Sequence, residues 1–159
     1  MKTILLLFCS LLLFSCSDDK STSSSNTDNT KDKYCADINN MPNGAENTYV
    51  RIVAVLPNPT GNDDYNERFR VQNFIKSLQI DLDTYKIRDD EGTIWKLSEL
   101  PKTTSGGSSV DGCQYVEYKS DKVAQLLNSG DTIFLYDSDE NLIQTFSFGA
   151  SSDGEWVFP

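Results

Sequence analysis

The sequence contains no histidine among its 159 residues. This absence excludes the Ser-His-Asp and Cys-His arrangements of nucleophilic catalysis, histidine general bases, and zinc or iron sites with histidine ligands. Most hydrolase and nuclease chemistry is therefore excluded. Carboxylate pairs, Ca²⁺ sites and lysine nucleophiles stay open.

Basic residues are scarce relative to acidic ones. The chain has 14 Lys and Arg against 24 Asp and Glu, and its formal net charge is −10. Proteins that bind nucleic acid gain most of their affinity from Lys and Arg that neutralise phosphates. Proteins that lie flat on anionic lipid need the same positive charge. The composition therefore argues against both kinds of partner.

No apolar run is long enough to span a bilayer, because the run from Ile4 to Phe14 covers 11 residues and a spanning helix needs about 20. Lys2 precedes this run, and residues 1–15 are predicted to be a signal peptide. The sequence Leu13-Phe14-Ser15-Cys16 resembles a bacterial lipobox. The resemblance implies cleavage before Cys16 and acylation of its thiol, and two or more acyl chains anchor a protein stably. The alternative is a secreted protein cleaved elsewhere.

The residues after Cys16 refine the expected location. Ser17-Asp18-Asp19-Lys20 resembles the acidic export signal of surface lipoproteins in the Bacteroidota, although these acids also suit the start of a solvated linker. Residues 17–33 contain no apolar side chain, which predicts a flexible linker. We predict an outer-membrane lipoprotein that faces the medium. Residues 16–46 are expected to form the lipidated cysteine and linker, and residues 47–159 one folded domain.

Cysteine is also rare. Cys9 leaves with the signal peptide and Cys16 takes lipid, so that Cys35 and Cys113 remain. An even pair in an exported chain predicts a disulfide; the alternative is two free thiols. The bond would close a loop of roughly 78 residues, worth about 4 kcal/mol in the chain-entropy model.

From residue 47 onward the pattern is that of β-structure. β-Branched and aromatic runs are separated by clusters of Gly, Asp, Asn and Ser, and the expected strands are 49–56, 68–73, 80–88, 93–97, 113–118, 132–137 and 142–148. Short strands at near-regular spacing predict a β-sandwich or barrel. One short helix is expected at Asp121–Asn128, with Ser120 as its N-cap and Gly130 just past its end.

Several segments follow one another in a set order along this domain: Val50–Pro59, Val71–Asn73, Ile80–Asp89, Leu126–Ile133 and Phe146–Phe148. This order resembles the lamin tail domain, an immunoglobulin-like β-sandwich found in nuclear lamins and in many bacterial surface proteins. The resemblance covers residues 49–148 and implies that fold, but it brings no shared catalytic residues. Asp111-Gly112-Cys113 and Glu140-Asn141 depart from the family pattern, and the two cysteines are not family features.

An acidic turn carries the first candidate site. Asp63, Asp64 and Glu67 could bind Ca²⁺ through their carboxylate oxygens or act as an acid–base pair. They could equally be turn formers, with Glu67 capping the turn or pairing with a strand arginine. All three interpretations stay open at this point.

Two further polar sets have a structural explanation beside a functional one. Asp137, Asp139 and Asn141 have the spacing of a calcium loop, but Leu142 stands where the loop needs Gly, which favours a hairpin turn. Arg68 and Arg70 share one face of a strand. They could bind an anionic ligand, and strand arginines also commonly pair with carboxylates on the next strand.

Aromatic residues supply the last candidates. Trp95, Tyr115, Tyr118 and Trp156 could include an exposed platform for sugar rings, whereas most aromatics of a small sandwich lie in its core. Trp95 and Trp156 are the residues we consider for glycan binding.

These observations lead to an expected function. We expect a non-enzymatic surface lipoprotein that binds an envelope or extracellular protein and needs no cofactor, with Ca²⁺ left open. One alternative is a glycan-binding module that uses Trp95 or Trp156. The other is a hydrolase that acts on glycans through carboxylates such as Asp63 and Glu67.

Overall fold

The computed structural model describes residues 34–35, 41–45, 48–103, 107 and 109–159. The predicted signal peptide, Cys16 and the Ser-rich linker lie outside these residues. Within the described part, no helix combines the length and the apolar character that crossing a membrane requires.

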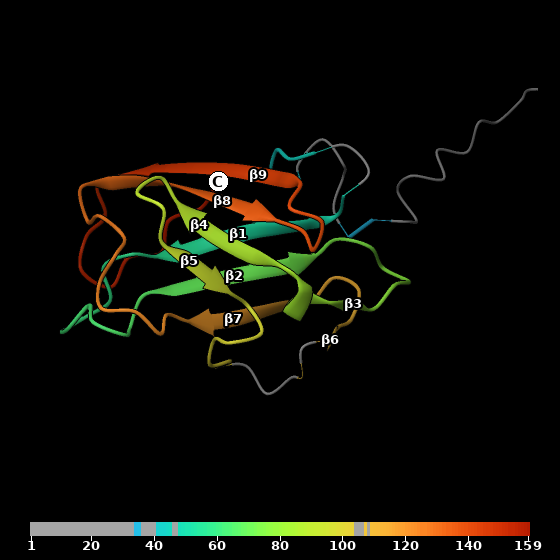
Figure 1. Ribbon diagram of the computed structural model, residues 1–159, viewed down its shortest axis with the longest axis horizontal. Helices are drawn as coiled ribbons and strands as arrows, with labels where there is room; N and C mark the ends of the chain where they lie inside the picture. Colours follow the sequence, from blue (N-terminus) through green and yellow to red (C-terminus); the bar gives the residue numbers. More distant parts are fainter. Residues whose placement is uncertain (1–33, 36–40, 46–47, 104–106, 108) are drawn as a thin grey trace, which may run out of the picture.

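Two antiparallel sheets face each other (Figure 1). The first has the order β1-β2-β7, with β1 at Val50–Leu56, β2 at Arg68–Asn73 and β7 at Tyr115–Lys119. The second has the order β5-β4-β8-β9, with β5 at Ile94–Lys96, β4 at Lys86–Asp89, β8 at Gly130–Tyr136 and β9 at Leu142–Gly149. A short ladder pairs β3 (Ile80–Asp81) with β6 (Ser109–Val110). This arrangement confirms the predicted all-β sandwich.

The core lies between the two sheets because apolar side chains alternate along the strands. On β2, Phe69 and Val71 are buried while Arg68 and Arg70 lie on the outer face. The largest fully buried apolar side chains are Trp95, Tyr118, Phe69, Ile52, Leu82, Ile87, Leu97, Ile133, Leu135 and Ile143. Burial of each aliphatic or Phe side chain of this kind stabilises the fold by roughly 1.5–3 kcal/mol.

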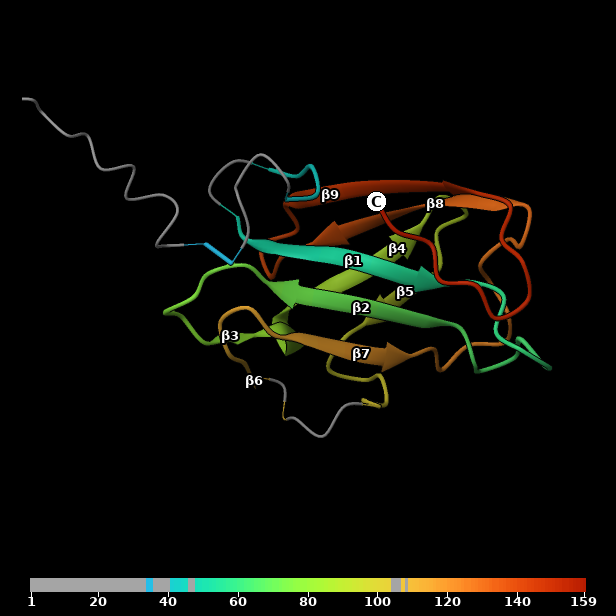
Figure 2. The same ribbon diagram turned by 180° about the vertical axis from the view of Figure 1, so that it is seen from behind.

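The edge strands β1 and β9 are joined by a side chain. The Gln144 carboxamide is buried; it accepts a hydrogen bond from the Ile52 N–H at 2.7 Å and donates one to the Ile52 carbonyl at 3.2 Å. Further along β1, Val55 and Val157 exchange two backbone hydrogen bonds of 2.9 and 2.8 Å. Figure 2 shows the C-terminal segment running beside β1. This pairing brings Trp156 to the first sheet.

Two contacts fasten the residues that precede β1. Cys35 and Cys113 form a disulfide with a Cα–Cα distance of 5.2 Å, as predicted. Arg51 is 2 % exposed and donates to the carbonyls of Pro42, Ala45 and Val50. Burial lowers the pKa of Arg51. The start of the domain is therefore held both covalently and by a buried guanidinium.

Two predicted elements are corrected by the structure. The helix expected at Asp121–Asn128 is absent, and this segment consists of bends and a turn. Its backbone N–H groups donate to carboxylates from other segments instead of to helical carbonyls. The strand expected at 80–88 is interrupted by a 3-10 helix, η2 (Leu82–Thr84), because the Asp81 carboxylate accepts a hydrogen bond from the Asp83 N–H.

Candidate functional site

The acidic turn between β1 and β2 packs against the segment that was expected to be helical. The Asp64 carboxylate accepts a hydrogen bond from the Ala124 N–H at 3.2 Å, and the Asp63 carboxylate accepts one from the Asn128 side-chain amide at 2.8 Å. The structure therefore brings the predicted residues together, and it directs their oxygens toward another part of the same chain.

Glu67 is the centre of this arrangement and is fully buried. Its Oε1 atom accepts two hydrogen bonds, from the Gln125 N–H at 2.9 Å and from the Leu126 N–H at 2.7 Å, while Oε2 has no partner in the described part of the chain. Burial raises the pKa of Glu67 to about 7, although the two backbone hydrogen bonds act in the opposite direction. Glu67 thus supplies the acceptor that an internal loop needs.

Asp131, at the start of β8, completes the set and was not a predicted site residue. Its carboxylate accepts hydrogen bonds from the Leu127 N–H at 3.2 Å and from the Thr132 N–H at 2.6 Å. Burial, with a contribution from nearby Asp90, raises its pKa to about 6. Asp64, Glu67 and Asp131 together pair four consecutive N–H groups, of residues 124–127. We call these three carboxylates the acidic cradle.

The acidic cradle offers little to a metal ion or a substrate. No group of three or more Asp, Glu, Cys or His side chains within the described residues is arranged to hold a metal ion. Calcium binding at Asp63, Asp64 and Glu67 therefore gains no geometric support. Glu67 is also inaccessible to a glycan chain, which weakens the hydrolase alternative that needs it as a catalytic acid or base.

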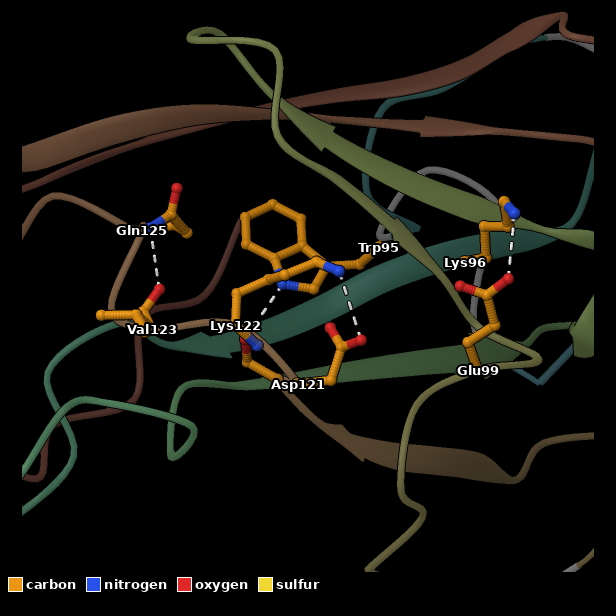
Figure 3. A network of polar contacts seen from close by, with 8 residues as sticks. Trp95, Lys96, Glu99, Asp121, Lys122, Val123 and Gln125 are labelled. Carbon is orange, nitrogen blue, oxygen red and sulfur yellow. Dashed lines mark hydrogen bonds and ion pairs between the residues drawn. The ribbon is translucent and has the colours of Figure 1, made fainter.

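Trp95, the first aromatic candidate, lies in the core and not on the surface. It is fully buried, its Nε1–H donates to the Ser120 hydroxyl at 3.0 Å, and its ring centroid is 5.1 Å from that of Phe69. Figure 3 shows the indole beside the segment that carries Asp121, Lys122 and Gln125. The expectation that Trp95 contributes to a ligand-binding platform is therefore corrected: this tryptophan supports the loop from inside.

The hairpin between β8 and β9 contains the calcium-like spacing. The Asp137 carboxylate accepts hydrogen bonds from the backbone N–H groups of Asp139 and Asn141, each at 2.9 Å, and Glu140 adopts a positive φ of 65°. These are the contacts of a tight turn. The interpretation of this segment as a hairpin is confirmed.

Trp156, the second aromatic candidate, is half-buried on the outer face of the first sheet. The Cζ atom of Arg70 lies 3.8 Å from the centroid of the Trp156 ring and 5.3 Å from that of Tyr115. Tyr115 is 43 % exposed. Both aromatic rings therefore lie within cation–π distance of one guanidinium, and this attraction stabilises the group.

The register of β2 and β7 positions the charged members of this group. Arg70 lies opposite Glu117, and Arg68 lies opposite Lys119. Both arginines bind the one carboxylate, Arg68 Nη1 at 2.9 Å and Arg70 Nε at 3.0 Å. The expectation that these arginines form cross-strand pairs is confirmed. We call the six residues Arg68, Arg70, Tyr115, Glu117, Lys119 and Trp156 the Arg70 surface.

Glu117 holds the two arginines of the Arg70 surface and is only 7 % exposed. Its burial opposes ionisation, but hydrogen bonds from Thr103, Arg70 and Arg68 outweigh that effect and lower its pKa. Sequence reasoning did not identify Glu117. The signal was present in the alternation of β7, which places Tyr115, Glu117 and Lys119 on one face.

A separate open hollow of about 430 Å³ lies beside β9. It is lined by residues 41–43, 144–147 and Pro159, none of which carries an ionisable side chain.

No protein-family model, curated protein or solved structure matches this chain. The resemblance to the lamin tail domain therefore stays a prediction, and the functional argument rests on the residues themselves.

Proposed function

We propose that this protein is a non-enzymatic binding module of the lamin-tail type, anchored to the outer membrane through acylated Cys16 and exposed to the medium. Its partner is an envelope or extracellular component, which it recognises with the Arg70 surface. The anchor rests on the lipobox and the acidic residues after Cys16. The binding role rests on the geometry of Arg70.

The observation that carries the proposal is the position of the Arg70 guanidinium over two aromatic rings, those of Trp156 and Tyr115, on an outer sheet face. Trp, Tyr and Arg side chains dominate the energetics of recognition surfaces. Trp and Tyr offer a large contact area with few rotatable bonds, and Arg adds a planar group with several hydrogen-bond donors. The acidic residues that might have served catalysis are instead engaged by the loop at 124–127.

The binding role is tested by crosslinking capture from intact cells with the tagged full-length lipoprotein. The Trp156→Ala variant is the test, and the Phe158→Ala variant is its matched control, because Phe158 is 67 % exposed on the same segment outside the Arg70 surface. We expect one component to be enriched with the wild type and the Phe158 variant and lost with the Trp156 variant. Equal capture by all three would contradict the proposed surface.

The anchor and its orientation require separate measurements. Metabolic labelling with an alkyne fatty acid should mark the wild type and fail to mark Cys16→Ser. Protease added to intact cells should then remove the folded domain. A labelled protein that resists protease only while cells are intact would place the domain in the periplasm.

A further inference from the structure

We infer that the Arg70 surface binds an acidic polysaccharide, with Arg70 holding a uronate carboxylate and the flanking aromatic rings packing against the sugar rings. This inference rests on the proposed function and names the ligand class of the same site. It goes beyond that function because the binding role alone does not choose between a protein, a neutral glycan and an acidic glycan.

The first step is the local charge. The whole chain has a net charge of −10, yet the Arg70 surface contains three cations, Arg68, Arg70 and Lys119, and one carboxylate, Glu117. Most other cations on the described surface are matched one to one, as in the pairs Lys86–Glu140, Lys96–Glu99, Lys102–Asp83 and Lys122–Asp121. The Arg70 surface therefore carries more cations than carboxylates in a chain whose net charge is negative.

The second step is the orientation of Arg70. Its Nε atom binds Glu117, and no hydrogen bond among the described residues uses its two terminal nitrogens. The bond to Glu117 and the cation–π contacts with Trp156 and Tyr115 restrict the position of the guanidinium. A guanidinium fixed in this way can bind the two oxygens of a planar carboxylate at little cost in side-chain entropy.

The third step is the pairing of aromatic rings with this cation. Tyr115 is 43 % exposed and Trp156 is half-buried, so that both offer apolar ring area next to the guanidinium. Sugar rings present C–H groups on one face, which pack favourably on aromatic rings, and uronates add a carboxylate at the ring edge. A ligand that combines a packed ring with a carboxylate satisfies both parts of the surface at once.

The remaining charge of the molecule favours a glycan over other polyanions. Nucleic acid and anionic lipid bind through many phosphates that demand many cations, and three cations in a chain of net charge −10 supply few such contacts. A glycan contact needs only a few sugar rings and one or two carboxylates. The acidic glycan is thus the polyanion that this surface fits.

The experiment measures binding of the full-length, detergent-solubilised protein to polygalacturonate and to alginate by calorimetry. Fully methyl-esterified polygalacturonate is the matched neutral ligand, because it keeps the sugar backbone and loses the charge. Dextran sulfate is the matched non-uronate polyanion. Trp156→Ala and Arg70→Lys test the site, and the second keeps the positive charge while removing the planar fork.

Phe158→Ala and Arg88→Lys are the control variants. Arg88 is an exposed arginine on the opposite sheet that also lies over aromatic rings, 5.5 Å from Phe134 and 5.6 Å from Tyr136. We expect at least one uronate polymer to bind at least about tenfold more tightly than the ester and than dextran sulfate. Both site variants should weaken binding by about tenfold or more, and both controls by less than about twofold.

The outcomes separate the ligand class from the proposed function. Equal affinity for the ester, equal affinity for dextran sulfate, or no binding of either uronate polymer overturns the inference, while capture from cells decides the binding role independently. Uronate binding that survives both site variants overturns the assignment to the Arg70 surface. Thermal unfolding of each variant shows whether a loss of binding reflects a loss of fold.

Discussion

The acidic cradle and the Arg70 surface both depend on a buried glutamate, but one glutamate binds backbone groups inside the fold and the other binds arginines on its outer face. In the acidic cradle, Glu67 is fully buried and accepts hydrogen bonds from backbone N–H groups of the same chain. In the Arg70 surface, Glu117 is 7 % exposed and binds two arginines that reach the outer face. Glu67 holds a loop against the domain, and Glu117 positions two arginines that face solvent.

The comparison shows that the number of charged residues in the sequence does not reveal which of them are free to contact a partner. The acidic residues, which are in excess, include three whose carboxylates accept hydrogen bonds from four backbone N–H groups. The cations, which are scarce, include two arginines that share one carboxylate. The carboxylates of the acidic cradle therefore serve the loop, whereas the arginines of the Arg70 surface reach the outer face, and the two regions should respond differently to substitution.

Among the residues of the two regions, the largest effect is expected at Glu67. Glu67→Ala removes the acceptor of the Gln125 and Leu126 N–H groups in a buried site, and we expect the free energy of unfolding to fall by about 2–4 kcal/mol. Glu67→Gln is the matched control because it keeps a carbonyl oxygen for these donors and should cost less. Denaturant titration of both variants measures this. An alanine variant as stable as the glutamine variant would show that the acceptor is dispensable.

The next effect is a pH dependence of opposite sign in the two regions. The pKa of Glu67 is raised to about 7, so its contribution is fully present below the unfolded pKa of about 4.3 and is lost as the pH rises through 7. We expect the wild type to lose on the order of 1–3 kcal/mol between pH 5 and pH 8, and Glu67→Gln to lose less. Asp131 acts in the same direction.

The pKa of Glu117 is lowered, so its contribution is present at neutral pH and is lost only as the pH falls below the usual glutamate range. Denaturant titrations across pH 3–8 of the wild type and of the two glutamine variants, Glu67→Gln and Glu117→Gln, separate the contributions. A wild-type stability that rises from pH 5 to pH 8 would contradict the assignment to Glu67.

A smaller effect is expected at Glu117 itself. Glu117→Gln removes a charge that binds two partly exposed arginines, and we expect a loss of about 1 kcal/mol in the free energy of unfolding at neutral pH. Glu99→Gln is the control, since its ion pair with Lys96 lies on the exposed surface and should contribute almost nothing. A Glu117 variant as unstable as Glu67→Ala would erase the contrast between the two regions.

The smallest effect on stability is expected at Trp156. Trp156→Ala removes a half-buried ring from an outer face, and we expect the free energy of unfolding to change by less than about 1 kcal/mol. Trp95→Ala, in the core, should cost about 3–5 kcal/mol. Calorimetric unfolding of the two variants measures the difference. Similar losses for both would mean that Trp156 serves the fold and not a partner.

Much of the fold could be predicted because the apolar residues of its strands form a recognisable local pattern. The runs at 49–56, 68–73 and 142–148 alternate or cluster apolar residues, and each lies within one residue of an observed strand. The break at Leu82–Thr84 was missed because it depends on one local cap by Asp81. Local patterns predict elements well where no single side chain competes with the backbone ladder.

The two sites were harder to predict because each joins distant segments. The helix expected at Asp121–Asn128 satisfied local rules, yet Asp64 and Glu67, about 60 residues earlier, capture its donors. Arg70 and Trp156 were candidates on separate grounds, and only the pairing of Val157 with Val55 brings them together. Such contacts follow from the register of the sheets, which a local pattern does not encode.

In the proposed lipoprotein, anchored through Cys16, the disulfide has a mechanical consequence. Tension that arrives at Cys35 passes through the sulfur atoms to Cys113, which lies two residues before β7. β7 carries Tyr115 and Glu117. Force from the proposed tether therefore reaches a ligand on the Arg70 surface through only a few residues of β7. Strands β1 to β6 lie inside the covalent loop and are shielded from extension. A pull on bound material would therefore strain the tether and β7 before it could unravel the remainder of the domain.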